Sequence, residues 1–172
     1  MSSPFAVRPA TVADLVAVSS MLGETWHASY DSIYGRDRVS ELTARWHSPD
    51  KLLGGLANKN GVFLVVDHES SIAGTASAVS DDCGAHVDLL RLYVRPSHQG
   101  GGLGAKLLEA TLRRFPRAQD IALDVEPANL RAIAFYQRQG FVAAATVSDC
   151  SGSGDGIPAL HMVRKTTAWS AT

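Results

Sequence analysis

Four glycines stand close together between an apolar, strand-like segment and an amphipathic, helix-like segment. They lie in the run Gln99-Gly100-Gly101-Gly102-Leu103-Gly104-Ala105. Because glycine has no Cβ atom, successive backbone N–H groups there can turn toward one point and approach a ligand closely. A helix that begins behind them adds unsatisfied N–H groups and the positive end of its dipole. The pattern is compatible with a phosphate or pyrophosphate site, and a plain flexible turn before a helix is the alternative.

Two general phosphate-loop patterns fit this segment poorly. Gly100, Gly102 and Ala105 match the spacing of the dinucleotide fingerprint GxGxxG/A. That fingerprint begins at the end of a strand within parallel βαβ units, whereas here residues 95–99 intervene and three strand-like segments precede without helices between them. The P-loop pattern fails, since no Gly-Lys-Ser/Thr follows at the required spacing. A dinucleotide-binding fragment stays as an alternative.

Length and composition indicate one compact domain. The chain has 172 residues, 45% hydrophobic and 19% charged, which excludes a disordered chain and a charge-rich coiled coil. The net charge of −1 leaves no electrostatic footprint for nucleic acid or an anionic membrane. Two cysteines are too few for a disulfide framework, the first residues carry no secretory signal, and no apolar run reaches the ~20 residues that cross a bilayer. We therefore expect a soluble, cytoplasmic protein with a single domain over residues 1–172.

Hydrophobic periodicity predicts helices and strands along the whole chain. The β-branched run Val62–Val66 is typical of a strand covered on both faces. Thr11 and Asp14 approximate a capping box, and Ser48-Pro49 is typical of a helix start. The predicted strands are 5–8, 62–66, 72–79, 87–94, 121–125, 141–147 and 159–164, and the predicted helices are 12–28, two short ones within 30–58, 102–115 and 130–139. Hairpins followed by a βαβ crossover predict a mixed sheet flanked by helices, an α/β or α+β fold.

Two motifs together resemble the GNAT superfamily of acyl-CoA-dependent N-acyltransferases. The run Gln99-Gly100-Gly101-Gly102-Leu103-Gly104 is similar to that family's Gln/Arg-x-x-Gly-x-Gly/Ala signature. A second motif follows at about the expected distance, with Asn129, then Ala132-x-x-Phe135-Tyr136, then Gly140-Phe141. The resemblance is strongest from Val87 to Phe141, and the order of strands fits over roughly the whole chain.

The resemblance implies a fold and a cofactor. The implied fold is a central mixed, mostly antiparallel sheet, splayed between its fourth and fifth strands, with acetyl-CoA in the gap. The pantetheine arm would add to the exposed strand edge by β-augmentation, and the pyrophosphate would sit on the loop amides. In the family, the asparagine contacts the cofactor's arm and the tyrosine lies near the sulfur. The implied cofactor-binding residues are Leu92, Tyr93, Val94, Gln99, Gly100, Gly101, Gly102, Leu103, Gly104, Ala105, Asn129 and Tyr136.

The sequence departs from the family pattern at one position and suggests a branch at others. Gly101 stands where the family commonly carries Arg or Lys, so the phosphate lacks that cationic partner. The segment with Trp26, Tyr30 and Tyr34, together with the run Arg91-Leu92-Tyr93-Val94, resembles the branch that acts on polyamines and other small amines, and the three aromatic residues are the implied substrate-binding residues. Aromatic walls suit a cationic amine, and the alternative for these side chains is ordinary core packing.

Amide formation from a thioester needs a neutral amine and a protonated leaving thiolate. A free alkyl amine has a pKa near ~10.4, so a carboxylate that takes its proton, directly or through water, accelerates the reaction. Asp88 on the fourth strand and Asp124 at the end of the fifth are the two candidate bases, and both are also compatible with solvated strand-end carboxylates. Tyr136 is the candidate acid for the thiolate, because a phenol is protonated at neutral pH.

The sequence therefore predicts an N-acetyltransferase that moves an acetyl group from acetyl-CoA to a primary amine of a small molecule or peptide. A non-catalytic acyl-CoA-binding module of the same fold is the alternative. The six histidines show no HxxxH spacing, so we expect no metal site. We expect no nucleic-acid or membrane partner, and a homodimer stays open.

Overall fold

The computed structural model describes residues 5–150 and 153–166. The chain divides into two compact units, one formed by Met1–Val79 with Arg91–Arg114 and the other by Ser80–Leu90 with Phe115–Thr172. Hydrogen bonds join seven strands in the order β1-β2-β3-β4-β5-β7-β6, and β4 (His86–Val94) runs from one unit into the other. The order of strands and helices is the one that the sequence predicts.

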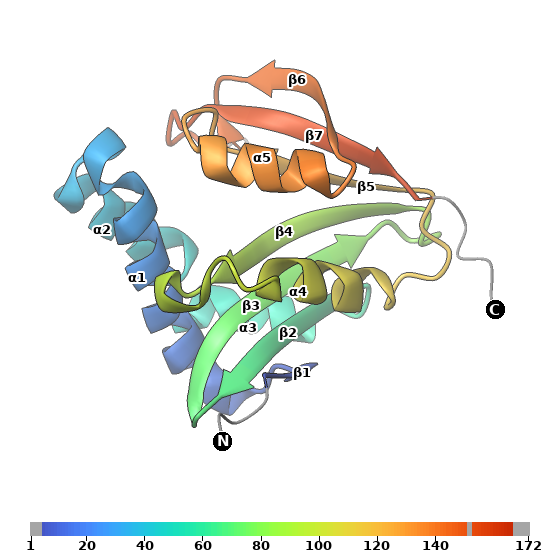
Figure 1. Cartoon of the computed structure of the whole chain (residues 1–172), viewed down its shortest axis with the longest axis horizontal. Helices are drawn as coiled ribbons and strands as arrows, with labels where there is room; N and C mark the ends of the chain where they lie inside the picture. The colour runs from blue at the N-terminus through green and yellow to red at the C-terminus, as the bar shows by residue number, and fades with distance from the viewer. Residues whose placement is uncertain (1–4, 151–152, 167–172) are drawn as a thin grey trace. The chain divides into compact units, whose positions relative to one another are not determined.

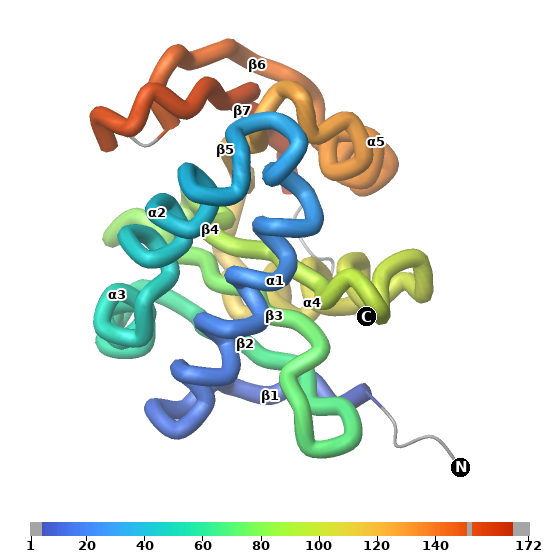
Figure 2. Tube along the Cα trace, turned by 90° about the vertical axis from the view of Figure 1, so that its left-hand side faces the viewer, coloured from blue at the N-terminus to red at the C-terminus, as the bar shows by residue number. Residues whose placement is uncertain are grey.

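The first unit has an antiparallel sheet with helices on both faces. Its strands are β1 (Ala6–Pro9), β2 (Gly61–His68) and β3 (Ser71–Ser80). The helices are η1 (Val12–Asp14), α1 (Leu15–Tyr34), α2 (Arg36–Trp46), α3 (Pro49–Ala57), η2 (Pro96–His98) and α4 (Leu103–Leu112). In Figures 1 and 2, α3 lies on one side of β2 and β3 and α4 on the other.

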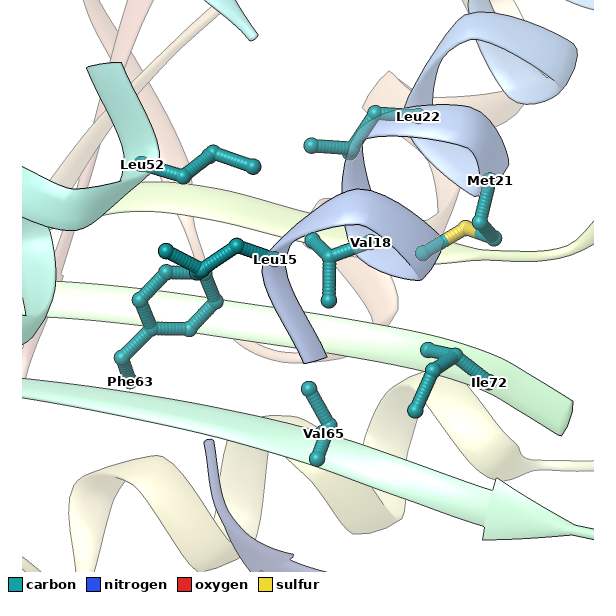
Figure 3. Packing of buried hydrophobic residues seen from close by; sticks show 8 residues of the cluster. All are labelled: Leu15, Val18, Met21, Leu22, Leu52, Phe63, Val65 and Ile72. Atoms are coloured by element: carbon teal, nitrogen blue, oxygen red, sulfur yellow. The ribbon is translucent and has the colours of Figure 1, made fainter. Parts of the chain in front are cut away.

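β2 is buried on both faces, as its β-branched run predicts. Phe63 and Val65 pack with Leu15, Val18 and other side chains of α1 and α3 (Figure 3). The alternate residues of β2 pack instead with Leu103 and Leu107 of α4. Since fully burying one such side chain stabilises the fold by about 1.5–3 kcal/mol, β2 is the strand that holds both helical layers.

Two helix boundaries differ from those predicted. The first helix continues past Ala28 to Tyr34, and it ends where Gly35 adopts φ +82° and donates its N–H to the Asp31 carbonyl. The helix predicted to reach Phe115 ends at Leu112. Pro116 accounts for the second difference, because a proline disfavours helical geometry in the residue before it.

The second unit is a smaller mixed sheet with one helix. Residues His86–Asp88 of β4 pair in parallel with the start of β5 (Asp120–Val125), and β5 pairs along its whole length with antiparallel β7 (Ala159–Lys165). β6 (Val142–Val147) pairs with β7, and α5 (Leu130–Arg138) covers one face of these strands (Figure 1). The parallel pairing stops at Ala122, so it is shorter than β5 itself. No helix among the described residues is long and apolar enough to span a bilayer.

Candidate active site

The glycine-rich segment forms a tight turn that leads directly into α4. Gly100 and Gly102 have φ of +87° and +80°, values that favour glycine, and Gly102 is the N-cap of the helix. The Lys106 N–H donates to the Gly102 carbonyl at 3.1 Å, which closes the first turn. The amides that precede Lys106 therefore lie at an open helix N-terminus, where they can bind an anion together with the helix dipole.

The turn is fastened to the end of β4. The Gln99 side chain donates to the Val94 carbonyl at 2.9 Å, and the Arg95 N–H donates to the Ala73 carbonyl at 2.8 Å. The Arg95 guanidinium also donates to the Ile72 carbonyl. The side chain of Gln99, a predicted cofactor residue, thus positions the loop.

Gly101 differs from the glycines on either side of it. Its φ lies outside the left-handed region, and a Cβ atom built on it would meet nothing within 4 Å. A side chain at this position would therefore be accommodated without backbone strain. Gly101 therefore lacks the positive charge of the family signature, although a Cβ atom at this position would meet no other atom.

In the second unit, α5 carries the two residues of the other motif. Asn129 is the N-cap of α5, and its side-chain oxygen accepts from the Ala132 N–H at 3.1 Å. Tyr136 is 9% exposed, and its ring makes edge contacts with Phe135 and Phe141 at centroid distances of 5.2 and 5.6 Å. The helix start and the phenol ring are thus both held in fixed positions.

The two candidate bases share one face of the second unit's sheet. Asp88 lies beside Ala122 in the parallel register, and Asp124 follows two residues further along β5. Asp88 is exposed, and within residues 5–150 and 153–166 no hydrogen bond or ion pair reaches its carboxylate. Asp124 lies directly opposite His161 on β7 and accepts a 2.8 Å hydrogen bond from its Nδ1. Of the two candidates, Asp88 is therefore the carboxylate without a hydrogen-bond partner among the described residues.

The predicted substrate-binding aromatics form part of a larger cluster in the first unit. Trp26 and Tyr30 are only 6% and 7% exposed, with ring centroids 4.7 Å apart, so core packing describes them better than an open cage. Tyr34 is half-buried and contacts Tyr30 at 6.2 Å. Trp46, the last residue of α2, contacts Trp26 edge-on at 5.4 Å.

Two polar residues to which the sequence analysis assigned no individual role join this cluster. His47 follows α2, is 5% exposed and contacts the Trp26 ring at 5.3 Å. Arg91 on β4 donates to the Trp46 carbonyl at 3.3 Å and to Ser77 Oγ at 3.3 Å. Burial, and next the positive charge of Arg91, lower the pKa of His47 to about 3, so its ring is neutral at physiological pH.

Metal-ligand geometry is absent from the described part of the chain, where no group of three or more His, Cys, Asp or Glu side chains could hold an ion. Neither Cys83 nor Cys150 forms a disulfide within the described part of the chain. The chemistry that the described residues offer is anion binding at the loop, a free carboxylate at Asp88 and a packed phenol at Tyr136.

Comparison with known proteins gives one family match and several relatives. The model of the acetyltransferase (GNAT) family matches residues 21–141. The aminoglycoside N(6′)-acetyltransferase type 1 of Klebsiella pneumoniae is 35% identical over 85 residues, covering 48% of this chain and 40% of that enzyme. The spermidine N(1)-acetyltransferase of Thermoplasma acidophilum is 26% identical over 153 residues, covering 86% of this chain and 91% of that enzyme. The PaiA N-acetyltransferase of Thermoplasma acidophilum, crystallised with coenzyme A, superimposes with a TM-score of 0.82 at 22% identity and covers 95% of this chain and 100% of that one.

The depressed pKa of His47 predicts a loss of stability in acid. Between pH 6.5, the ordinary pKa of histidine, and about pH 3, His47 is protonated in the unfolded chain but neutral in the folded chain. The free energy of unfolding therefore has its full value above pH 6.5 and decreases as the pH falls toward 3. Urea unfolding should show that His47→Phe loses about 2 kcal/mol less than the wild type between pH 7.5 and pH 5. Trp46→Phe, which perturbs the same cluster without removing a titrating group, should keep the wild-type loss. Equal losses in His47→Phe and the wild type would mean that His47 ionises freely in the folded protein.

Proposed function

Because the chain belongs to the acetyltransferase (GNAT) family, we propose that it transfers an acetyl group from acetyl-CoA directly to a primary amine. The acceptor is a small molecule or peptide, and residues 1–172 form a single catalytic domain. The observation that carries the proposal is the turn at Gly100–Gly102, which opens α4 with unpaired amides at the place where the family signature lies. Relatives named for aminoglycosides and spermidine support an amine as acceptor.

Acetyl-CoA is held by backbone groups in this proposal. The pyrophosphate accepts hydrogen bonds from the amides of Gly100–Ala105, where the dipole of α4 adds a positive potential. The pantetheine arm pairs with the backbone of Leu92–Val94 as an added strand. Asn129 contributes at the start of α5, where its oxygen already serves as the helix cap.

Proton transfer follows from the residues of the second unit. Asp88 takes the proton of the amine through a bridging water, because its carboxylate is exposed and free of partners among the described residues. The amine nitrogen attacks the thioester carbon, and the C–N bond forms as the C–S bond breaks. Tyr136 then donates its phenolic proton to the leaving thiolate, and the products are the acetylated amine and coenzyme A. The backbone N–H of Leu92 or Val94 is the proposed donor to the developing oxyanion.

The proposal includes a cytoplasmic location and a possible homodimer. The two cysteines, Cys83 and Cys150, form no disulfide among the described residues, and this fits a reducing compartment such as the cytoplasm. A homodimer is the assembly to be tested, by light scattering coupled to size-exclusion chromatography. Nucleic acid and membranes are not among the proposed partners.

Thiol release from acetyl-CoA tests the proposal against its alternative. Purified protein should release coenzyme A faster in the presence of primary amines than in their absence, across a panel of polyamines, aminoglycosides, amino acids and peptides. A protein that binds acetyl-CoA tightly yet turns over none of these amines is a non-catalytic acyl-CoA-binding module.

Charge substitutions at Gly101 probe the phosphate site without straining the backbone. Gly101→Arg should tighten acetyl-CoA binding about twofold to fivefold, because it adds an exposed cation beside the pyrophosphate. Gly101→Glu should weaken binding by at least as much, and both effects should shrink at high salt. Calorimetric titration measures the affinities, with circular dichroism as the control for folding. Identical affinities for acetyl-CoA in the two variants would contradict the assignment of the pyrophosphate to this loop.

Tyr136→Phe isolates the acid. The substitution keeps the ring contacts with Phe135 and Phe141 and removes only the hydroxyl. Since general acid catalysis contributes about 10²–10⁴-fold, kcat should decrease within that range while the KM for acetyl-CoA barely changes. A kcat within a factor of about 3 of the wild type would assign protonation of the thiolate to another group or to water.

Paired Asp→Asn substitutions identify the base. Asp88→Asn should make the rate depend on neutral amine from solution, so its pH–rate profile should climb about tenfold per unit up to the pKa of the amine. Asp124→Asn removes the negative charge beside His161 while keeping an oxygen that can accept its hydrogen bond, and it should leave the wild-type profile unchanged. The reverse result, a changed profile in the Asp124 variant alone, would move the base to β5.

A further inference from the structure

Four buried polar atoms of the aromatic cluster have no hydrogen-bond partner among the described residues. They are Trp26 Nε1, His47 Nδ1, His47 Nε2 and Arg91 Nε. Trp26 and His47 are 6% and 5% exposed, so bulk water does not serve these groups. Buried polar groups are nearly always paired, and a cluster of unpaired ones in one place points to a partner that the chain itself does not supply.

The residues that carry the unpaired atoms lie close together in the first unit. The rings of Trp26 and His47 are 5.3 Å apart, and those of His47 and Tyr93 are 6.1 Å apart. The Arg91 guanidinium donates to the carbonyl of Trp46, the residue that precedes His47. α1, the end of α2 and β4 therefore direct these atoms into one neighbourhood of the first unit.

Most of the unpaired atoms are hydrogen-bond donors. The indole and guanidinium nitrogens can only donate, and a neutral imidazole offers one donor and one acceptor. Arg91 also brings a positive charge, and no carboxylate forms an ion pair with it among the described residues. Its two side-chain hydrogen bonds, both 3.3 Å long, end on a carbonyl and a hydroxyl and leave the charge uncompensated. An anionic oxygen acceptor matches this set, whereas a second cation would be repelled.

We propose that the donor cluster of Trp26, His47 and Arg91 recognises a carboxylate on the acceptor, so that the preferred substrate is an amine that also carries an acid group. This inference rests on the proposed acetyltransferase activity and narrows its substrate class. It separates this chain from relatives named for spermidine and aminoglycosides, which are polycations.

Matched pairs of acceptors that differ only in the carboxylate test the proposal. L-tyrosine is compared with tyramine, and L-lysine with cadaverine, by thiol release and by quenching of tryptophan fluorescence. The wild type should favour the carboxylate-bearing member in kcat/KM by about tenfold or more, because a site built for a hydrogen-bonding group rejects the analogue that lacks it. Preference for tyramine and cadaverine would overturn the inference and leave the proposed function intact.

Variants of the cluster separate recognition from folding. Arg91→Gln should reduce the carboxylate preference at least about tenfold, while acetyl-CoA affinity by calorimetry stays unchanged. Trp26→Phe, which keeps an aromatic ring and removes one donor, should reduce the preference by a smaller factor. Arg45→Gln removes an exposed arginine of α2, ion-paired with Glu41, and should keep the wild-type preference.

Two outcomes would contradict the proposal even with folded variants. An equal loss toward both members of each pair in Arg91→Gln would assign the arginine a structural role at Trp46 and Ser77. Unchanged preference in both Arg91→Gln and Trp26→Phe would mean that internal water serves the unpaired atoms. The fluorescence titration needs no turnover, so a protein inactive toward every amine yet selective for carboxylates in binding would refute the proposed function alone.

Discussion

The close approach of α4 to the first unit's sheet is the contact on which the phosphate-binding turn depends. A Cβ atom at position 74 would lie 3.0 Å from Leu107 Cδ1 and 3.0 Å from the Tyr93 carbonyl oxygen, so any larger residue would push α4 or the end of β4 away from β3 by a few tenths of an ångström. Leu103 and Leu107 then pack on the sheet and fix where α4 begins. The direction of the loop amides is thus a consequence of core packing.

Preorganisation of the turn follows from the same packing. Gln99 and Arg95 tie the turn to the backbone at Val94 and Ala73, and positive φ at Gly100 and Gly102 is already adopted in the folded chain. Little backbone freedom is left for a ligand to remove on binding, which favours affinity without a charged side chain at the loop. On the proposed function, this preorganisation compensates for the glycine that stands where the family signature usually has a cation.

Local patterns in the sequence were enough to predict most of the fold and the backbone part of the site. Val62–Val66 predicted a strand buried on two faces, Ser48-Pro49 a helix start and Gly100–Gly102 a turn before a helix, because each depends on neighbouring residues alone. The hydrogen bond between Asp124 and His161 could not be predicted, since it requires the register of β5 on β7. His47 and Arg91 meet only after α1, α2 and β4 have packed, and neither position carries a motif.

Charge in the first unit is distributed in a way that composition does not reveal. The turn proposed to bind phosphate carries no cation at Gly101, whereas Arg91 lies half-buried beside Ser77 and Trp46 without an acidic partner among the described residues. Burial lowers the pKa of Arg91, because holding its positive charge there costs free energy. The position of Arg91 lowers the stability of the fold, and the proposed binding of an anionic group explains why a cation stands there. Under the proposed function, the acceptor side of the reaction is therefore where we expect this chain to differ from relatives named for spermidine and aminoglycosides.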